Sequence, residues 1–76
     1  MAIFLDASYF LAIYNEDDVH HKRALILAEK IDFNDFGQAI TSDDVFDEVV
    51  SVALRKFGKE KAQTLGRQIV SSIFMV

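Results

Sequence analysis

The sequence predicts a small α/β domain whose parallel strands are joined by helices. Three short segments, residues 3–5, 38–41 and 73–76, have the length and residue types of strands. Two helical patterns separate each of these segments from the next, so the expected order is strand, helix, helix, strand, helix, helix, strand. Parallel pairing needs such crossovers, because a tight turn reverses the chain direction. With 76 residues, we expect a single domain spanning 1–76.

The first predicted strand is followed directly by an acid. Ile3–Leu5 is apolar without alternation, which predicts a strand covered on both faces. Asp6 comes next, and either Asp6 or Ser8 can cap a helix that runs through Tyr14. Open α/β sheets form binding crevices at the carboxyl ends of their strands, so Asp6 stands where a site is expected. Capping of the helix would by itself also explain an acid at this position.

A polar turn and a second helix follow. Asp17 or Asp18 is placed to cap a helix that begins near His21. Adjacent positions on a helix diverge, so His20 and His21 cannot readily share one metal ion. We interpret them as a solvated pair. Residues 32–37 indicate a loop ahead of the second strand.

The third helix carries a second acid that needs an explanation. Thr41 or Ser42 is expected to cap this helix, and its many valines predict deep packing. Glu48 shares a stripe with these valines, where a buried acid is costly unless it is paired or binds a cation. Asp44 lies one turn earlier, so a shared cation would relieve the like-charge repulsion. Arg55 is the alternative partner for Glu48 in a salt bridge.

The last third of the chain predicts one more helix and a final strand. Gly58 is a C-cap signal for the third helix, and a fourth helix is expected from Lys59, with Gly66 as its weak point. The segment 73–76 is apolar and strand-like. A frayed last turn of the fourth helix is the alternative interpretation of this segment.

Composition and charge exclude several classes of function. The net charge of −4 argues against a module that coats nucleic acid, and the lack of cysteine rules out thiolate metal sites. The longest apolar run, residues 9–14, is too short to span a bilayer, and no basic secretion signal precedes it. We therefore expect a cytoplasmic protein without membrane contacts. Because 51% of the residues are hydrophobic in so short a chain, we also expect self-association into a homo-oligomer.

Two stretches taken together resemble the PIN-domain family. They are Ile-Phe-Leu-Asp-Ala-Ser-Tyr-Phe-Leu-Ala at residues 3–12 and Ile-Thr-Ser-Asp-Asp-Val-Phe-Asp-Glu-Val at residues 40–49. Within that family the chain is most similar to the VapC-like toxin ribonucleases of toxin–antitoxin pairs. These open with a hydrophobic strand, Asp-x-Ser/Thr and an apolar helix, and continue with a helix that often bears His and Arg-Ala. Phosphotransferases with Asp-x-Asp after the first strand fit less well, because Ser8 replaces their second acid.

The resemblance implies a three-layer α/β/α fold with a short parallel sheet and a metal-dependent ribonuclease activity. Asp6 and Glu48 would be catalytic residues that bind Mg²⁺ or Mn²⁺, with Glu48 as a ligand or as the residue that orients metal-bound water. Ser8 would hydrogen-bond within the site. The cations would activate water and stabilise charge on the scissile phosphate. The implied partners are RNA and an antitoxin protein.

The chain also departs from the family pattern. PIN proteins are longer and supply two further acids from their second half, whereas Glu60 is the sole acid after Glu48 here. We therefore expect about half of a PIN domain, with its first strand at a sheet edge that is open to pairing. Weak or absent nuclease activity is expected from this chain alone. Two alternatives stay open: a truncated or degenerate PIN-like module that acts only in protein–protein association, and a small α/β interaction domain in which Asp6 only caps a helix.

Overall fold

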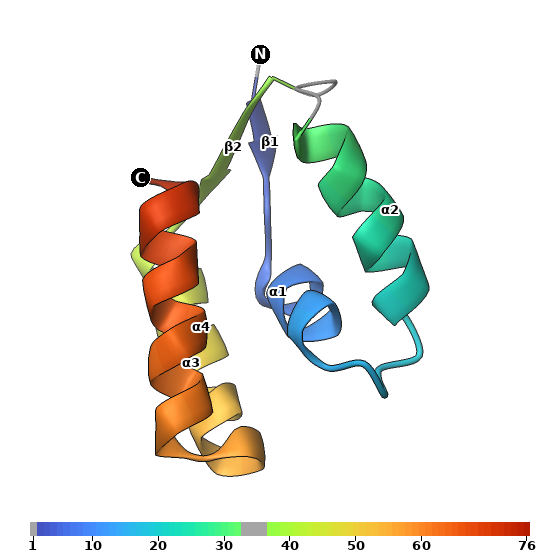
Figure 1. Cartoon of the computed structure of the whole chain (residues 1–76). Coiled ribbons are helices and arrows are strands. Elements are labelled where there is room, and N and C mark those ends of the chain that lie inside the picture. The colour runs from blue at the N-terminus through green and yellow to red at the C-terminus, as the bar shows by residue number, and fades with distance from the viewer. Residues whose placement is uncertain (1, 33–36) are drawn as a thin grey trace.

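A computed structural model describes residues 2–32 and 37–76 of the chain and confirms the α/β class. The described strands are β1 (Ala2–Phe4), β2 (Gln38–Thr41) and β3 (Phe74–Met75), and the helices are α1 (Ala7–Tyr14), α2 (His21–Asp32), α3 (Asp43–Phe57) and α4 (Lys59–Ser72). Figure 1 shows α2 on one side of β1 and β2, with α3 and α4 on the other side. The predicted order of elements is confirmed.

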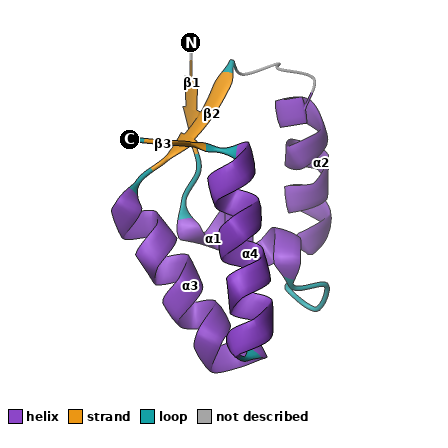
Figure 2. Cartoon of the chain, turned by 60° about the vertical axis from the view of Figure 1, so that its left-hand side comes forward, coloured by secondary structure: helices purple, strands orange, loops and turns teal. Residues whose placement is uncertain are grey.

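The sheet is parallel, with the order β1-β2-β3. Ile3 pairs with Ala39, and Ile40 pairs with Phe74 (Figure 2). Within the described residues β1 is therefore an edge strand, as expected. The prediction that this strand is covered on both faces is wrong, because Phe4 is 52% exposed and Ile3 is only half-buried. Successive side chains point to opposite faces of a sheet, so the exposure of Phe4 means that the described elements leave the face on which it lies partly uncovered.

The hydrophobic core lies where the end of β1 meets the helices. Its buried members are Leu5, Ala7, Phe10, Val49, Ala53, Ala62, Leu65 and Ile69. The prediction of deep packing for α3 holds for one face only. Val49 and Ala53 are fully buried, whereas Leu54 is 50% exposed. This difference arises because α3 packs against α4 and α1, and Leu54 lies on the part of its surface that neither helix fully covers.

Local capping signals are largely as predicted. Ser42 Oγ accepts a hydrogen bond from the Val45 N–H at 3.3 Å and so caps α3. Gly58 ends the same helix with a positive φ of 91°, a conformation that favours glycine. The chain then closes as a strand, since the Val76 N–H donates to the Thr41 carbonyl at 2.9 Å. The alternative of a frayed helical turn at the C-terminal segment is wrong.

Gly66 lies at the packing contact between α3 and α4. It is buried, and an added Cβ would lie 3.5 Å from Phe46 Cζ and 3.6 Å from Val50 Cγ2. These are ordinary van der Waals distances, so an alanine would fit without displacing its neighbours. The predicted weak point of α4 is therefore a matter of helix propensity and not of space.

The loop predicted at residues 32–37 lies mostly outside the described residues. Asp32 ends α2, and Gly37 precedes β2 with a positive φ of 79°. Among the helices in the described ranges, none is both long and apolar enough to cross a membrane.

Candidate active site

Asp6 follows β1 and caps α1. Its Oδ1 accepts two hydrogen bonds, one from Ser8 Oγ at 2.8 Å and one from the Tyr9 N–H at 3.2 Å. The predicted cap is thus confirmed, and Ser8 is joined to Asp6 as expected. In the part of the chain that the structure describes, no hydrogen bond reaches the other carboxylate oxygen, Oδ2. Asp6 and Ser8 are both exposed, so water already solvates this charge.

The backbone just before Asp6 is fixed by the neighbouring strand. Thr41 is fully buried, and its Oγ1 donates to the Leu5 carbonyl at 2.9 Å. The Leu5 N–H in turn donates to the Ile40 carbonyl at 2.8 Å. The backbone N–H and C=O of Leu5 are thus both hydrogen-bonded to residues of β2. These two bonds fix the backbone position from which Asp6 follows.

The start of α2 is fastened to α1. A ring nitrogen of His21, Nδ1, lies 2.6 Å from the Ala12 carbonyl, which it reaches as a hydrogen-bond donor. Ala24, almost one turn further on, is buried. Ahead of the helix, Asp18 Oδ1 accepts from the His20 N–H at 2.8 Å. The interpretation of the two histidines as a solvated pair is therefore right for exposed His20 and wrong for half-buried His21.

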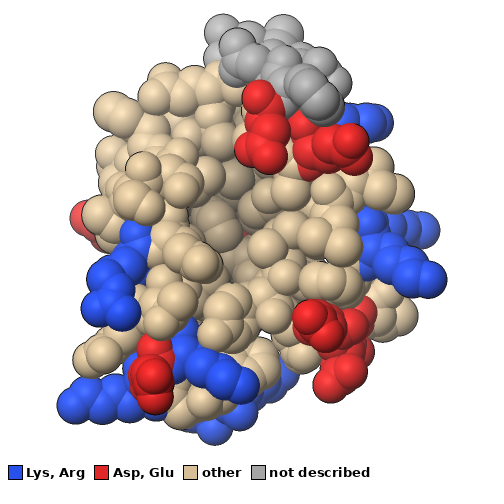
Figure 3. Space-filling model, viewed as in Figure 1, with Lys and Arg blue, Asp and Glu red and all other residues tan. Residues whose placement is uncertain are grey.

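A hollow of about 300 Å³ opens between α1 and α2 beside the Asp6–Ser8 pair. Its lining residues are Asp6, Ser8, Tyr9, Ala12, His20, Arg23, Ala24 and Leu27. One carboxylate, one aliphatic hydroxyl, one phenol, one imidazole and one guanidinium therefore line the same hollow. Figure 3 shows basic side chains on the right, where α2 lies, and on the left and lower left, where α3 and α4 lie, whereas the middle of this face has no basic side chain.

Tyr9 contributes a neutral phenol to this hollow. Burial raises the pKa of its hydroxyl above the ordinary value of 10.0, and the Asp32 carboxylate raises it further. The phenol therefore stays protonated at neutral pH. Its ring packs edge-on against that of Phe10, with a centroid separation of 5.3 Å.

Glu48, the second predicted site residue, lies on α3. It is exposed on α3, it does not line the hollow, and no described hydrogen bond joins it to Asp6 or Ser8. The argument that a buried acid needs a partner is wrong for Glu48, because water solvates it. In the described ranges it forms no ion pair with Arg55. Its role as a metal ligand stays a prediction.

The donor set around Asp6 suits a weakly held cation. Mg²⁺ prefers oxygen ligands, keeps several waters and is commonly held by one or two carboxylates together with substrate phosphates. The carboxylate of Asp6 and the hydroxyl of Ser8 supply such oxygens. Over residues 2–32 and 37–76 no group of three or more His, Cys, Asp or Glu side chains is placed to hold a metal ion. The described residues therefore do not supply a complete set of ligands for a metal ion.

Comparison with known proteins places this chain in a family. The PIN domain family model matches residues 3–76, and the chain belongs to the PIN domain family. Among solved structures, the VapC20 toxin of Mycobacterium tuberculosis, which cleaves the Sarcin-Ricin loop, superposes with a TM-score of 0.75 at 18% identity. The match covers 99% of this chain and 55% of the toxin, so the chain spans about half of that protein's length. At this identity the likeness shows the fold. No curated protein matches the chain in sequence.

The sequence pattern did not predict that Arg23 and His20 line the same hollow as Asp6. Two signals were present: the His and Arg-Ala pattern at residues 21–24, which is part of the family resemblance, and the helical stripe that contains Ala24. The stripe predicts that α2 packs against another element, but it does not predict that this element is α1. Their position next to Asp6 is a property of the tertiary structure.

Proposed function

We propose that this chain forms the N-terminal part of a metal-dependent ribonuclease of the VapC-like toxin group. The observation that carries the proposal is the Asp6–Ser8 pair, joined at 2.8 Å directly after β1 in a chain of the PIN domain family. The shared fold with a toxin that cleaves the Sarcin-Ricin loop supports the same class of substrate. RNA is accordingly the proposed substrate, and an antitoxin protein is the proposed partner.

Asp6 is the proposed ligand of Mg²⁺ or Mn²⁺. Such a cation, when bound, activates water and stabilises the charge that develops on a scissile phosphate. Ser8 keeps one carboxylate oxygen of Asp6 engaged and so restricts the orientation of that side chain. Glu48 is proposed as a second ligand or as the residue that orients water at the cation.

An RNA cleavage assay tests the proposed function. With Mg²⁺ or Mn²⁺ present, we expect the chain to cut a labelled RNA weakly or not at all, because no group of three or more His, Cys, Asp or Glu side chains is placed to hold a metal ion among the described residues. Any cleavage should disappear with a chelator and in the Asp6→Asn variant. Cleavage that persists in that variant or with the chelator would contradict the assignment. Strong cleavage that the variant loses would support the assignment and show that fewer acids suffice.

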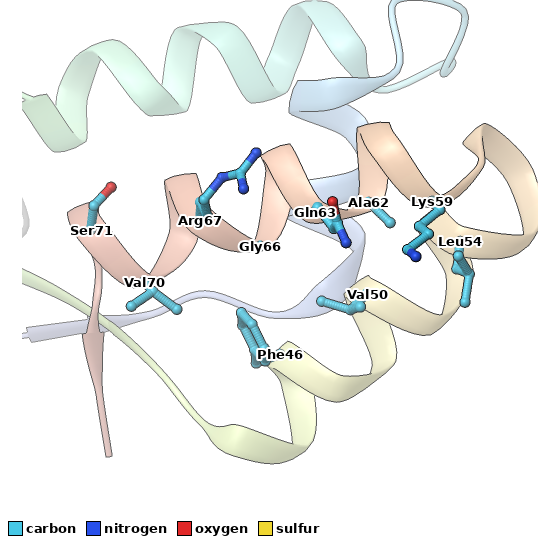
Figure 4. A pocket seen from close by; sticks show the side chains of 10 residues that line it. All are labelled: Phe46, Val50, Leu54, Lys59, Ala62, Gln63, Gly66, Arg67, Val70 and Ser71. Atoms are coloured by element: carbon cyan, nitrogen blue, oxygen red, sulfur yellow. The ribbon is translucent and has the colours of Figure 1, made fainter.

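We also propose that the chain self-associates through an apolar groove between α3 and α4. The groove has a volume of about 670 Å³ and is lined by Phe46, Val50, Leu54, Lys59, Ala62, Gln63, Gly66, Arg67, Val70 and Ser71 (Figure 4). Leu54 and Val70 are 50% and 59% exposed, and contiguous apolar surface of this kind is typical of protein contacts. A second copy of the chain would bury this surface. The same groove supports the alternative function, a module that acts only by association.

Substituting Val70 by aspartate should weaken this association. A charge buried at an apolar contact is costly, so we expect the dissociation constant to rise about tenfold or more. Val19→Asp is the matched control, because Val19 is 88% exposed and lies outside the groove. Sedimentation velocity over a range of protein concentrations gives the readout. A monomer in the unmodified chain, or equal effects of the two variants, would contradict the proposal.

A further inference from the structure

Arg23 lines the hollow beside Asp6 and Ser8, yet it is not engaged there in an ion pair. Its side chain is exposed, and within residues 2–32 and 37–76 no carboxylate lies within salt-bridge distance of it. The guanidinium therefore keeps its donors available in a hollow that also contains the carboxylate of Asp6. Guanidinium groups bind phosphate oxygens well, because their planar donor pattern matches two oxygens at once.

The position of Arg23 is set by the packing of its helix. Arg23 directly precedes Ala24, which is buried, and lies two residues after His21, whose ring contacts the Ala12 carbonyl at 2.6 Å. These two contacts hold the first turns of α2 against α1. The backbone at Arg23 is thus held next to α1, the helix that carries Ser8. This packing limits the region that the guanidinium can reach.

We propose that Arg23 binds a backbone phosphate of the RNA substrate at the Asp6–Ser8 hollow. The proposal rests on the ribonuclease function given above and adds a residue that makes the phosphate contact. A chain with a net charge of −4 repels nucleic acid as a whole, so it needs a local cation where the RNA approaches an acidic site. Within the hollow, Arg23 is the residue with a permanent positive charge.

The test measures binding of a fluorescent single-stranded oligouridylate by anisotropy, with a chelator present and over a series of salt concentrations. Each phosphate contact contributes about −0.7 to the slope of log K against log salt for a single strand. Arg23→Gln should therefore reduce the steepness of this slope by about 0.7 and weaken binding several-fold at low salt. Arg23→Lys keeps the charge and should keep the slope, with a smaller loss of affinity.

Lys22→Gln is the matched control, because Lys22 is exposed on the same helix, changes the net charge equally and does not line the hollow. Its slope should stay within experimental error of the unmodified chain. Equal effects of the Lys22 and Arg23 variants would overturn the proposal, as would an unchanged slope in Arg23→Gln or an unmodified chain that binds no RNA. Because a chelator is present, these outcomes do not depend on metal binding. If the chain binds no metal ion but Arg23→Gln still reduces the salt slope of RNA binding, the result would count against the ribonuclease function alone.

Discussion

The Phe10→Ala variant is expected to lose about 3–5 kcal/mol of folding free energy. Phe10 is 5% exposed in the core that α1 forms with α3 and α4. Removing its ring loses the free energy gained by transferring the ring from water to the core, and it also leaves a cavity. It also removes the edge-on contact with Tyr9. A domain of this size has a total stability of only about 4–11 kcal/mol. We therefore expect the variant to lose at least about a quarter of its folding free energy.

Urea unfolding followed by circular dichroism measures this loss. The control is Phe74→Ala, the same change at a phenylalanine of β3 that is 55% exposed, and it should cost about 1 kcal/mol. Both variants must be compared at one protein concentration, since self-association stabilises the folded state. Equal losses in the two variants would contradict the described core.

Elements whose signals are local were predicted well from the sequence. Asp6 as a helix cap, Ser42 as the cap of α3 and Gly58 as its end all depend on residues within one turn of each other. The strand at Phe74–Met75 followed from a short apolar run after a complete helix. The fold class then followed from the order of these elements, because parallel strands need crossover connections and helices between the strands supply them.

Features that depend on which surfaces meet were predicted less well. The burial of Phe4 and of the α3 side chains was overestimated. An apolar pattern does not say how many neighbouring elements cover each side chain. His20 and Arg23 were not placed beside Asp6, since the approach of α2 to α1 is a tertiary contact. The burial argument for Glu48 was wrong, because its side chain is exposed, whereas the metal-binding role that the family resemblance implies for it stays a prediction.

The Asp6→Asn variant should lose divalent cation binding while it keeps its fold. Asparagine caps helices about as well as aspartate, so the free energy of unfolding should change by less than about 0.5 kcal/mol. The amide oxygen can still accept from Ser8 Oγ and the Tyr9 N–H, but the negative charge that attracts Mg²⁺ or Mn²⁺ is gone. We expect affinity for Mn²⁺ to fall about tenfold or more.

Asp6→Ala is the comparison that separates the two roles of this residue. It removes the cap as well as the charge and should cost about 1 kcal/mol of stability in addition to the metal affinity. If Asp6 only caps α1, Asp6→Asn would bind Mn²⁺ as well as the unmodified chain does. In that case Asp6→Ala would differ from it in stability alone.

Paramagnetic broadening by Mn²⁺ in the amide NMR spectrum tests the metal-binding role of Asp6 most directly. Titration of the unmodified chain should broaden the signals of Asp6, Ser8 and Tyr9 first, because Mn²⁺ bound at the carboxylate lies close to these amides. The same titration of Asp6→Asn should leave them sharp. Broadening that begins instead at Asp17 and Asp18, or that is unchanged in the Asp6→Asn variant, would contradict a metal site at Asp6.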